Sequence, residues 1–230
     1  MPKTAIMFGS IGALAETSDI QRQSYNQALK EAGLKWEWDH NTYAQLLEQA
    51  GGKERLAMLA AATGTDLSDE KIEDIHARKT ELACAAMKDQ GVGLRPGVAE
   101  LVALAKERSM KLALVTTTYQ PNIDAVFAAA GDAFSAEDFD HIVDRNKVTE
   151  GKPSPEPYEL TLEELGLAAD DALAIEDTAT SVMSAKRAGI DTVATPGALT
   201  RDQDFWQADL VLDSLHDGSG LDARLTDMLG

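Results

Sequence analysis

Six short apolar segments constrain the fold of this chain most strongly. They cover approximately residues 4–8, 111–116, 141–144, 172–175, 192–195 and 210–212, and the last five alternate with longer, helix-length segments. Short strands that alternate with helices are typical of βαβ units, in which the strands lie parallel in one sheet. The sequence therefore predicts an α/β fold, a Rossmann-like doubly wound parallel sheet with helices on both faces.

Between the first and the second of these strands, residues 16–91 contain no strand-like run. Glycines divide this stretch into pieces of helical length. Ser68, with two acidic residues after it, is a favourable N-cap for a long helix that continues to about residue 90. We therefore predict two domains, an α/β core made of residues 1–15 and 92–230 and an inserted all-helical domain made of residues 16–91.

The formal net charge of −18 over 230 residues limits the partners of this protein. A chain this acidic repels nucleic acids and anionic membranes, and no basic run offsets the charge, so neither is an expected partner. No apolar run reaches the roughly 20 residues of a membrane span, and the N-terminus lacks the form of a signal peptide. The single cysteine, Cys84, cannot form a disulfide within the chain, which suits a reducing compartment. We expect a cytoplasmic protein in which any anionic ligand is held by a few placed cations.

Polar side chains follow several of the predicted strands directly. Thr116 and Thr117 follow one strand, Glu176 and Asp177 follow another, and Lys152 lies in a proline-rich loop between them. Because ligands of parallel α/β sheets bind beyond the carboxyl ends of the strands, these groups should converge on one crevice. The sequence thus predicts a site that combines hydroxyls, an ammonium group and two carboxylates.

The order of these groups resembles the haloacid dehalogenase (HAD)-like superfamily of phosphoryl-transfer hydrolases. The resemblance is closest to its CbbY-like phosphatases, and the segments that carry it are residues 33–38 (GLKWEW), 51–55 (GGKER), 94–98 (LRPGV) and 208–212 (ADLVL). The first motif of the family reads F-D-x-D-G-T-L, whereas residues 8–14 read F-G-S-I-G-A-L. Gly9 therefore stands where the family has its nucleophilic aspartate, and Ile11 stands where it has the aspartate that protonates the leaving group.

The substitutions at these two positions remove the covalent route through a phosphoaspartate, which needs a nucleophile in line with the leaving group. Ser10 is the one nucleophile-like side chain left in the loop. Since side chains alternate along a strand, however, Ser10 faces away from the crevice if positions 9 and 11 face it. The resemblance therefore implies a catalytically degenerate site, a pseudoenzyme.

The same resemblance implies roles for the other polar residues. Thr116, with Thr117 beside it, would hydrogen-bond a phosphoryl group, and Lys152 would neutralise its charge. Glu176 and Asp177 would bind Mg²⁺, a hard cation that takes carboxylate oxygens, but weakly or not at all without the aspartate at position 9. The alternatives are structural, because the threonine hydroxyls could cap the helix that follows them and Asp177 could cap the helix through residues 181–188.

The helical insert resembles the cap of the CbbY-like family, in which it closes over the crevice. Lys53, Glu54 and Arg55 would then face the substrate, and the alternative is an exposed start of a helix. Residues near Ala15 and Leu94, where the chain enters and leaves the insert, would be the hinges of such a lid.

Three hypotheses follow. The first is a binding or regulatory protein that keeps a phosphate-binding crevice for a small phosphorylated metabolite or an inorganic anion. The second is a residual or altered hydrolase with Mg²⁺, in which water replaces the missing carboxylate. The third is a structural remnant whose site residues are inherited without use.

Overall fold

The computed structural model describes residues 2–9, 11–48 and 51–230, and its centre is a six-stranded sheet in the order β3-β2-β1-β4-β5-β6. All five neighbouring pairs of strands are parallel, which confirms the predicted doubly wound sheet. The strands are β1 (Ala5–Phe8), β2 (Lys111–Val115), β3 (His141–Val143), β4 (Ala172–Glu176), β5 (Asp191–Ala194) and β6 (Leu210–Val211). Their ends lie within one residue of the six predicted segments, and β4 continues through Glu176, which pairs with Ala194.

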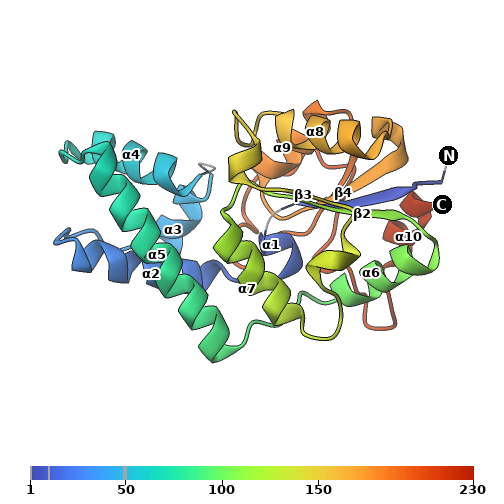
Figure 1. The fold of residues 1–230 in the computed structure, drawn as a ribbon, viewed down its shortest axis with the longest axis horizontal. Coiled ribbons are helices and arrows are strands. Elements are labelled where there is room, and N and C mark those ends of the chain that lie inside the picture. Colours follow the sequence, from blue (N-terminus) through green and yellow to red (C-terminus); the bar gives the residue numbers. More distant parts are fainter. Residues whose placement is uncertain (1, 10, 49–50) are drawn as a thin grey trace.

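Helices cover both faces of this sheet, as Figure 1 shows. On one face lie α1 (Ile11–Leu14), α6 (Val98–Glu107), α7 (Gln120–Ala130) and α10 (Ala223–Leu229), and on the other α8 (Glu156–Leu165) and α9 (Ala179–Arg187). Three single 3₁₀ turns complete the connections: η1 (Ala136–Asp138), η2 (Arg145–Lys147) and η3 (Ala169–Asp171). The alternation of side chains along β1 supplies both cores, because Ile6 and Phe8 pack on the α6 and α7 side while Ala5 and Met7 pack on the α8 side.

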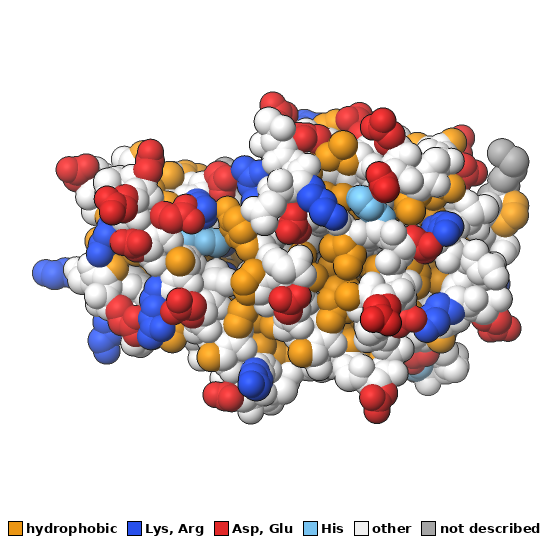
Figure 2. All heavy atoms as spheres, in the orientation of Figure 1, with side chains coloured by type: hydrophobic (Ala, Val, Ile, Leu, Met, Phe, Trp, Pro, Cys, Tyr) orange, Lys and Arg blue, Asp and Glu red, His pale blue; other side chains and the backbone are white. Residues whose placement is uncertain are grey.

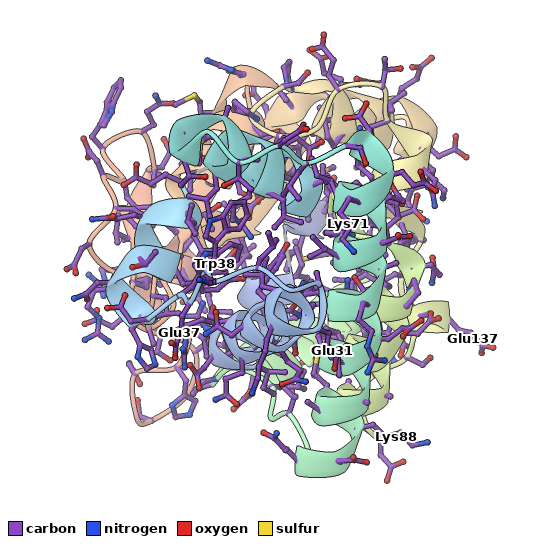
Figure 3. All side chains as sticks on the ribbon, turned by 90° about the vertical axis from the view of Figure 1, so that its left-hand side faces the viewer. Glu31, Glu37, Trp38, Lys71, Lys88 and Glu137 are labelled. Atoms are coloured by element: carbon purple, nitrogen blue, oxygen red, sulfur yellow. The ribbon has the colours of Figure 1, made fainter. Side chains whose placement is uncertain are left out.

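Residues 18–90 form a separate group of helices beside one end of the sheet (Figure 1), namely α2 (Ser18–Glu31), α3 (His40–Leu46), α4 (Gly52–Thr63) and α5 (Asp69–Gln90). They have their own apolar cluster, in which Trp38 stacks on Tyr43 with ring centroids 5.9 Å apart and packs at a tilt against Tyr25 with centroids 4.8 Å apart. Figure 3 shows Trp38 inside this group and Lys88 at the far end of α5, pointing outward. The predicted N-cap Ser68 accepts the N–H of Lys71 at 3.2 Å.

The two points where the chain enters and leaves this helical group lie side by side. Ala15 and Leu94 form an isolated antiparallel bridge, and the N–H of Arg95 donates to the carbonyl of Leu14 at 2.8 Å. The chain therefore crosses between sheet and helices at one double connection. The predicted domain boundaries lie at this place, and the lid motion remains a prediction.

The register of the strands brings the candidate residues to one edge of the sheet. Phe8 pairs with Leu114 of β2 and with Ile175 of β4, so Gly9, Val115 and Glu176 stand next to one another at the carboxyl ends. The helical group covers this edge (Figure 1). A site at this edge would therefore be formed by side chains from the ends of these strands and from the helices that face them.

Candidate functional site

A cavity of about 200 Å³ separates the carboxyl edge of the sheet from the helical group. The predicted residues on its wall are Ile11, Thr116, Thr117 and Asp177 from the sheet side and Lys53, Glu54 and Arg55 from the helices. Gly9, Lys152 and Glu176 are absent from that wall as far as the structure describes it. The structure thus gathers most of the predicted residues around one cavity and places the remaining three behind it.

Gly9 leaves a space that another residue fills. A Cβ atom at Gly9 would stand 2.0 Å from both Cδ and Oε2 of Glu176. The carboxylate of Glu176 therefore lies where the side chain of an aspartate at position 9 would begin. Residue 11, in contrast, lines the cavity with its hydrocarbon side chain and offers no proton donor. Ser10, the alternative nucleophile, lies outside the described residues.

Lys152 and Glu176 form a buried ion pair. The Nζ atom of Lys152 donates to Oε1 of Glu176 at 2.5 Å and to the carbonyl of Val115 at 2.8 Å, and the two side chains are 2% and 0% exposed. The hydroxyl of Tyr158 donates to the same Oε1. Burial, followed by the charge of Glu176, raises the pKa of Tyr158 well above its usual value, so this hydroxyl remains a donor.

Position 176 reaches Tyr158 because of the strand in which it lies. The alternation along β4 places Ala172, Ala174 and Glu176 on the face that packs against α8, and Tyr158 belongs to that helix. The side chain of position 9 would point to the same face, since Ala5 and Met7 of β1 do so. Parallel pairing thus brings both positions to one spot beside Lys152.

Asp177 is the carboxylate that reaches the cavity from β4. It is buried, and its Oδ2 would lie 1.9 Å from a Cβ at Gly12, so the absence of a side chain at Gly12 makes room for it. The guanidinium of Arg95, which donates to the carbonyl of Gly12 at 3.0 Å, is close enough to interact electrostatically with Asp177. The alternative that Asp177 caps the following helix is wrong, because the N-cap of α9 is Thr178, whose hydroxyl accepts the N–H of Ser181 at 3.2 Å.

The carboxylates do not form a metal site in this arrangement. Among the described residues, no three acidic, histidine or cysteine side chains come together as ligands. Glu176 is bonded to Lys152 and Tyr158, and the carbonyl of Ile11 accepts the N–H of Ala15 at 2.8 Å. Of the two carboxylates predicted to bind Mg²⁺, only Asp177 therefore lines the cavity, and the two are not placed as a pair of ligands to one ion.

The threonines after β2 organise a turn at the cavity. The hydroxyl of Thr116, which is 1% exposed, accepts the N–H of Thr118 at 3.2 Å, and the hydroxyl of Thr118 accepts the side-chain amide of Asn122 at 3.0 Å. The expectation that one of these hydroxyls caps α7 is wrong, because its N-cap position is Tyr119 and no side chain caps it. Thr116 and Thr117 instead border the cavity, where their hydroxyls can meet a ligand.

Residues 53–55 of the helical group border the same cavity. The ammonium of Lys53 pairs with Glu73 at 2.5 Å and lies 4.9 Å from the ring centroid of Tyr119, across the boundary between helices and sheet. The Nε of Arg55 donates to the carbonyl of Leu46 at 2.7 Å. The carboxylate of Glu54 lies over Gly51, where a Cβ would stand 2.1 Å from Oε2 of Glu54. The start of α4 therefore faces the sheet and not only solvent.

Two cavity residues on α5, His76 and Lys79, were not anticipated from the sequence. The Nζ of Lys79 lies 4.7 Å from the ring centroid of Tyr25, and burial together with the charge of Arg55 lowers the pKa of Lys79 to about 7. Burial and the charge of Lys79 lower the pKa of His76 to about 3, so this imidazole is neutral at pH 7. It stacks edge-on against Tyr119 at 5.6 Å.

A signal for these two residues was present in the sequence. The buried positions of α5 include Ile72, Ile75, His76, Lys79 and Ala83, which follow helical spacing. A lysine and a histidine thus lie on the apolar face of a long helix, where charged residues are rare unless they have a partner or a function. Arg145, which follows β3, also lines the cavity.

The glycine pair at the start of α4, Gly51 as its N-cap and Gly52 as its first residue, brings that helix close to these side chains. A Cβ at Gly52 would stand 2.4 Å from the hydroxyl of Tyr25 and 2.5 Å from Nε2 of His76. A glycine is therefore required there for the helix to approach them. The backbone at the start of α4 therefore lies close to Tyr25 and His76, and both of these side chains line the cavity.

The cations of the cavity contrast with the outer surface. On the face in Figure 2, lysine and arginine side chains are dispersed among acidic ones, with no large basic patch. In the cavity, Lys53, Arg55 and Lys79 converge from two helices. Such a site can hold a small anion through charge-assisted hydrogen bonds. None of the described helices is both long and apolar enough to cross a membrane.

Known proteins resemble this chain over nearly its whole length. The model of the haloacid dehalogenase-like hydrolase family matches residues 8–195. Protein CbbY of Cereibacter sphaeroides is 40% identical over 217 residues, which cover 94% of either chain. Protein CbbY, plasmid, of Cupriavidus necator is 40% identical over 219 residues, 93% of this chain and 86% of the relative.

Solved structures agree with these relatives. The crystal structure of CbbY from Rhodobacter sphaeroides in complex with phosphate superimposes with a TM-score of 0.88 at 39% identity, and covers 96% of this chain and 98% of its own. A mutant of that CbbY, in complex with xylulose-1,5-bisphosphate, gives the same TM-score of 0.88. Both the fold and the sequence of this chain are thus similar to a protein that binds phosphate and a sugar bisphosphate.

Proposed function

Because this chain belongs to the haloacid dehalogenase-like hydrolase family, and within it to the CbbY-like group, we propose that it binds a small phosphorylated metabolite without hydrolysing it through a phosphoaspartate. The observation that carries this proposal is at Gly9, where the carboxylate of Glu176 stands in the space of the missing nucleophile. That carboxylate is buried and bonded to Lys152, so it does not face the cavity as a nucleophile. The protein is accordingly a binding member of a catalytic family.

The cavity supports the binding half of the proposal. Thr116 and Thr117 offer hydroxyls from the sheet, while Arg55 and Lys79 offer positive charge from the helices. The two groups lie on opposite walls, which suits an anionic ligand that extends across the cavity. Since a relative was solved with xylulose-1,5-bisphosphate, a sugar bisphosphate is the first ligand to test.

Isothermal titration calorimetry tests binding, and a phosphate-release assay on the same preparation tests hydrolysis. We expect xylulose-1,5-bisphosphate to bind and no phosphate to be released above background with Mg²⁺ present. Loss of a nucleophile lowers kcat by about 10⁶ in a serine protease, so turnover should be at the limit of detection. Silence in calorimetry for both the bisphosphate and inorganic phosphate at millimolar concentration would favour the structural remnant.

A residual hydrolase is the second candidate, and Asp177 is the observation in its favour, because its carboxylate lines the cavity and could orient a water molecule. In that case a slow release of phosphate should survive repurification and disappear in Asp177→Asn. Equal background rates in the native protein and in Asp177→Asn exclude this candidate.

A further inference from the structure

Gly9, Lys152, Glu176 and Tyr158 form a closed group behind the cavity, which we call the Lys152 chamber. The carboxylate and the ammonium are 0% and 2% exposed, and neither residue belongs to the described wall of the cavity. One oxygen of Glu176, Oε1, accepts from both Lys152 and Tyr158. The other, Oε2, has no hydrogen-bond partner among the described residues.

Space in this chamber allows one carboxylate only. The Cδ of Glu176 lies 2.0 Å from the place of a Cβ at Gly9. The carboxyl carbon of an aspartate there would lie about 1.5 Å from that Cβ, the length of a carbon–carbon bond. The Cβ of such an aspartate would therefore already collide with the carboxyl group of Glu176. Position 176 can occupy this spot only because position 9 has no side chain.

The charges in the chamber also explain why Glu176 occupies this place. A buried ammonium needs a counter-charge, since desolvation of an unpaired ion is costly. Within the chamber, Glu176 supplies one negative charge at 2.5 Å from the Nζ of Lys152. The ammonium is thus neutralised before any ligand arrives, and a phosphate in the cavity gains little from it.

We propose that Lys152 marks an anion site that the protein fills with its own Glu176 carboxylate, so that removal of this carboxylate opens a site for a small external anion. The site takes an ion of the size and charge of formate, since the space released is that of a carboxyl group. This inference does not depend on ligand binding in the cavity, because its test measures only how an anion in the chamber changes the Tm.

Chemical rescue is the first test. Glu176→Ala should lower the Tm by about 6–20 °C, because removing one partner of a buried ion pair is strongly destabilising in a domain of this size. Formate should then raise the Tm of Glu176→Ala with increasing concentration, since it binds only the folded state. Sodium chloride at the same ionic strength serves as the control salt.

The matched controls separate a site from a general salt effect. Glu176→Gln keeps the space filled and should not respond to formate, and neither should the native protein. Glu176→Ala combined with Lys152→Met lacks the ammonium and should also show no response. If Glu176→Ala is insoluble, the readout is the yield of soluble protein refolded with formate against the yield with chloride. Equal responses to formate in all variants, or none in Glu176→Ala, would overturn the proposal.

A double-mutant cycle is the second test and needs no added anion. Gly9→Ala should lower the Tm of the native protein, because its Cβ collides with Glu176. The same substitution should cost much less in the Glu176→Ala background. Gly93→Ala is the control, since a Cβ at Gly93 would meet nothing within 4 Å. An equal loss from Gly9→Ala in both backgrounds would show that Glu176 does not fill the place of the missing side chain.

Discussion

The buried lysines on the two sides of the cavity differ in whether they have a counter-charge. On the sheet side, the ammonium of Lys152 is paired with Glu176 in a closed chamber. On the helical side, Lys79 is equally buried, yet it lies beside the ring of Tyr25 and the charge of Arg55, with no carboxylate partner among the described residues. A buried cation without a counter-ion costs free energy that a bound anion can return. From this comparison we predict that the positive charge that attracts an anion lies on the helical side, whereas Lys152 on the sheet side is occupied by Glu176.

The strongest test of this comparison is to restore the sheet side. Gly9→Asp combined with Ile11→Asp adds two carboxylates near Glu176 and Asp177. The one at position 9 must displace the Glu176 carboxylate, because its Cβ would stand 2.0 Å from it, so this collision and the added repulsion should lower the Tm in chelator. Mg²⁺ should raise the Tm again and permit some phosphatase activity, as followed by differential scanning fluorimetry and phosphate release. Gly9→Asp alone should be slower than the double variant by about 10²–10⁴, since the leaving group lacks its acid.

Ile11→Asp alone serves as the control, since it adds a carboxylate without a nucleophile, and it should neither hydrolyse phosphate esters nor gain stability from Mg²⁺. A folded double variant that binds no Mg²⁺ and releases no phosphate would mean that the sheet side has changed beyond these two positions.

The helical side is tested by the loss of one cation. Lys79→Met should weaken the binding of the bisphosphate, measured by calorimetry, about 30-fold or more, because truncating a buried charge that contacts a ligand typically costs this much. Lys88→Met removes the same charge from the exposed end of the same helix (Figure 3) and should leave the affinity unchanged. Equal affinities of the two variants would contradict recognition by the helical side.

A pH titration gives a smaller effect with a defined sign. Since burial and Arg55 lower the pKa of Lys79 to about 7, this residue loses its charge as the pH rises through 7 in the free protein. Affinity for sulfate, which does not itself titrate in this range, should therefore fall between pH 6 and pH 9. His76 stays neutral throughout, because its pKa is about 3. Calorimetry at several pH values should show the fall in the native protein and none in Lys79→Met.

The smallest expected effect is on the stability of the free protein. The pKa of Lys79 is about 7 when folded and near its ordinary value of 10.5 when unfolded, so the unfolded state binds more protons between these values. The contribution of Lys79 to stability therefore increases as the pH rises from 7 toward 10.5, and its full cost is present below pH 7. Lys79→Met should accordingly stabilise the protein more at pH 6 than at pH 9 in thermal melts. The opposite order would show that Lys79 is protonated with a partner.

Much of this architecture could be predicted from local sequence. The six strands were predictable because short apolar runs bounded by glycine and polar residues form buried parallel strands in almost any context. That position 9 carries no side chain could also be read from the sequence, and the resemblance to the family's first motif predicts that a nucleophile is missing there. His76 and Lys79 could also have been found, because they interrupt the apolar face of one helix.

The place of Glu176 could be learned only from the tertiary structure. Its role depends on Gly9, on Lys152 and on Tyr158, which come from three other parts of the chain and meet through the pairing of β1 with β4 and the packing of α8 on the sheet. Sequence alone identifies a carboxylate after a strand, and this is equally compatible with a metal ligand, a helix cap or a counter-ion. Its role is decided by residues that are distant in the sequence, because they determine the space and the charge around the carboxylate. A buried carboxylate is stable only beside a counter-charge, which here is the ammonium of Lys152.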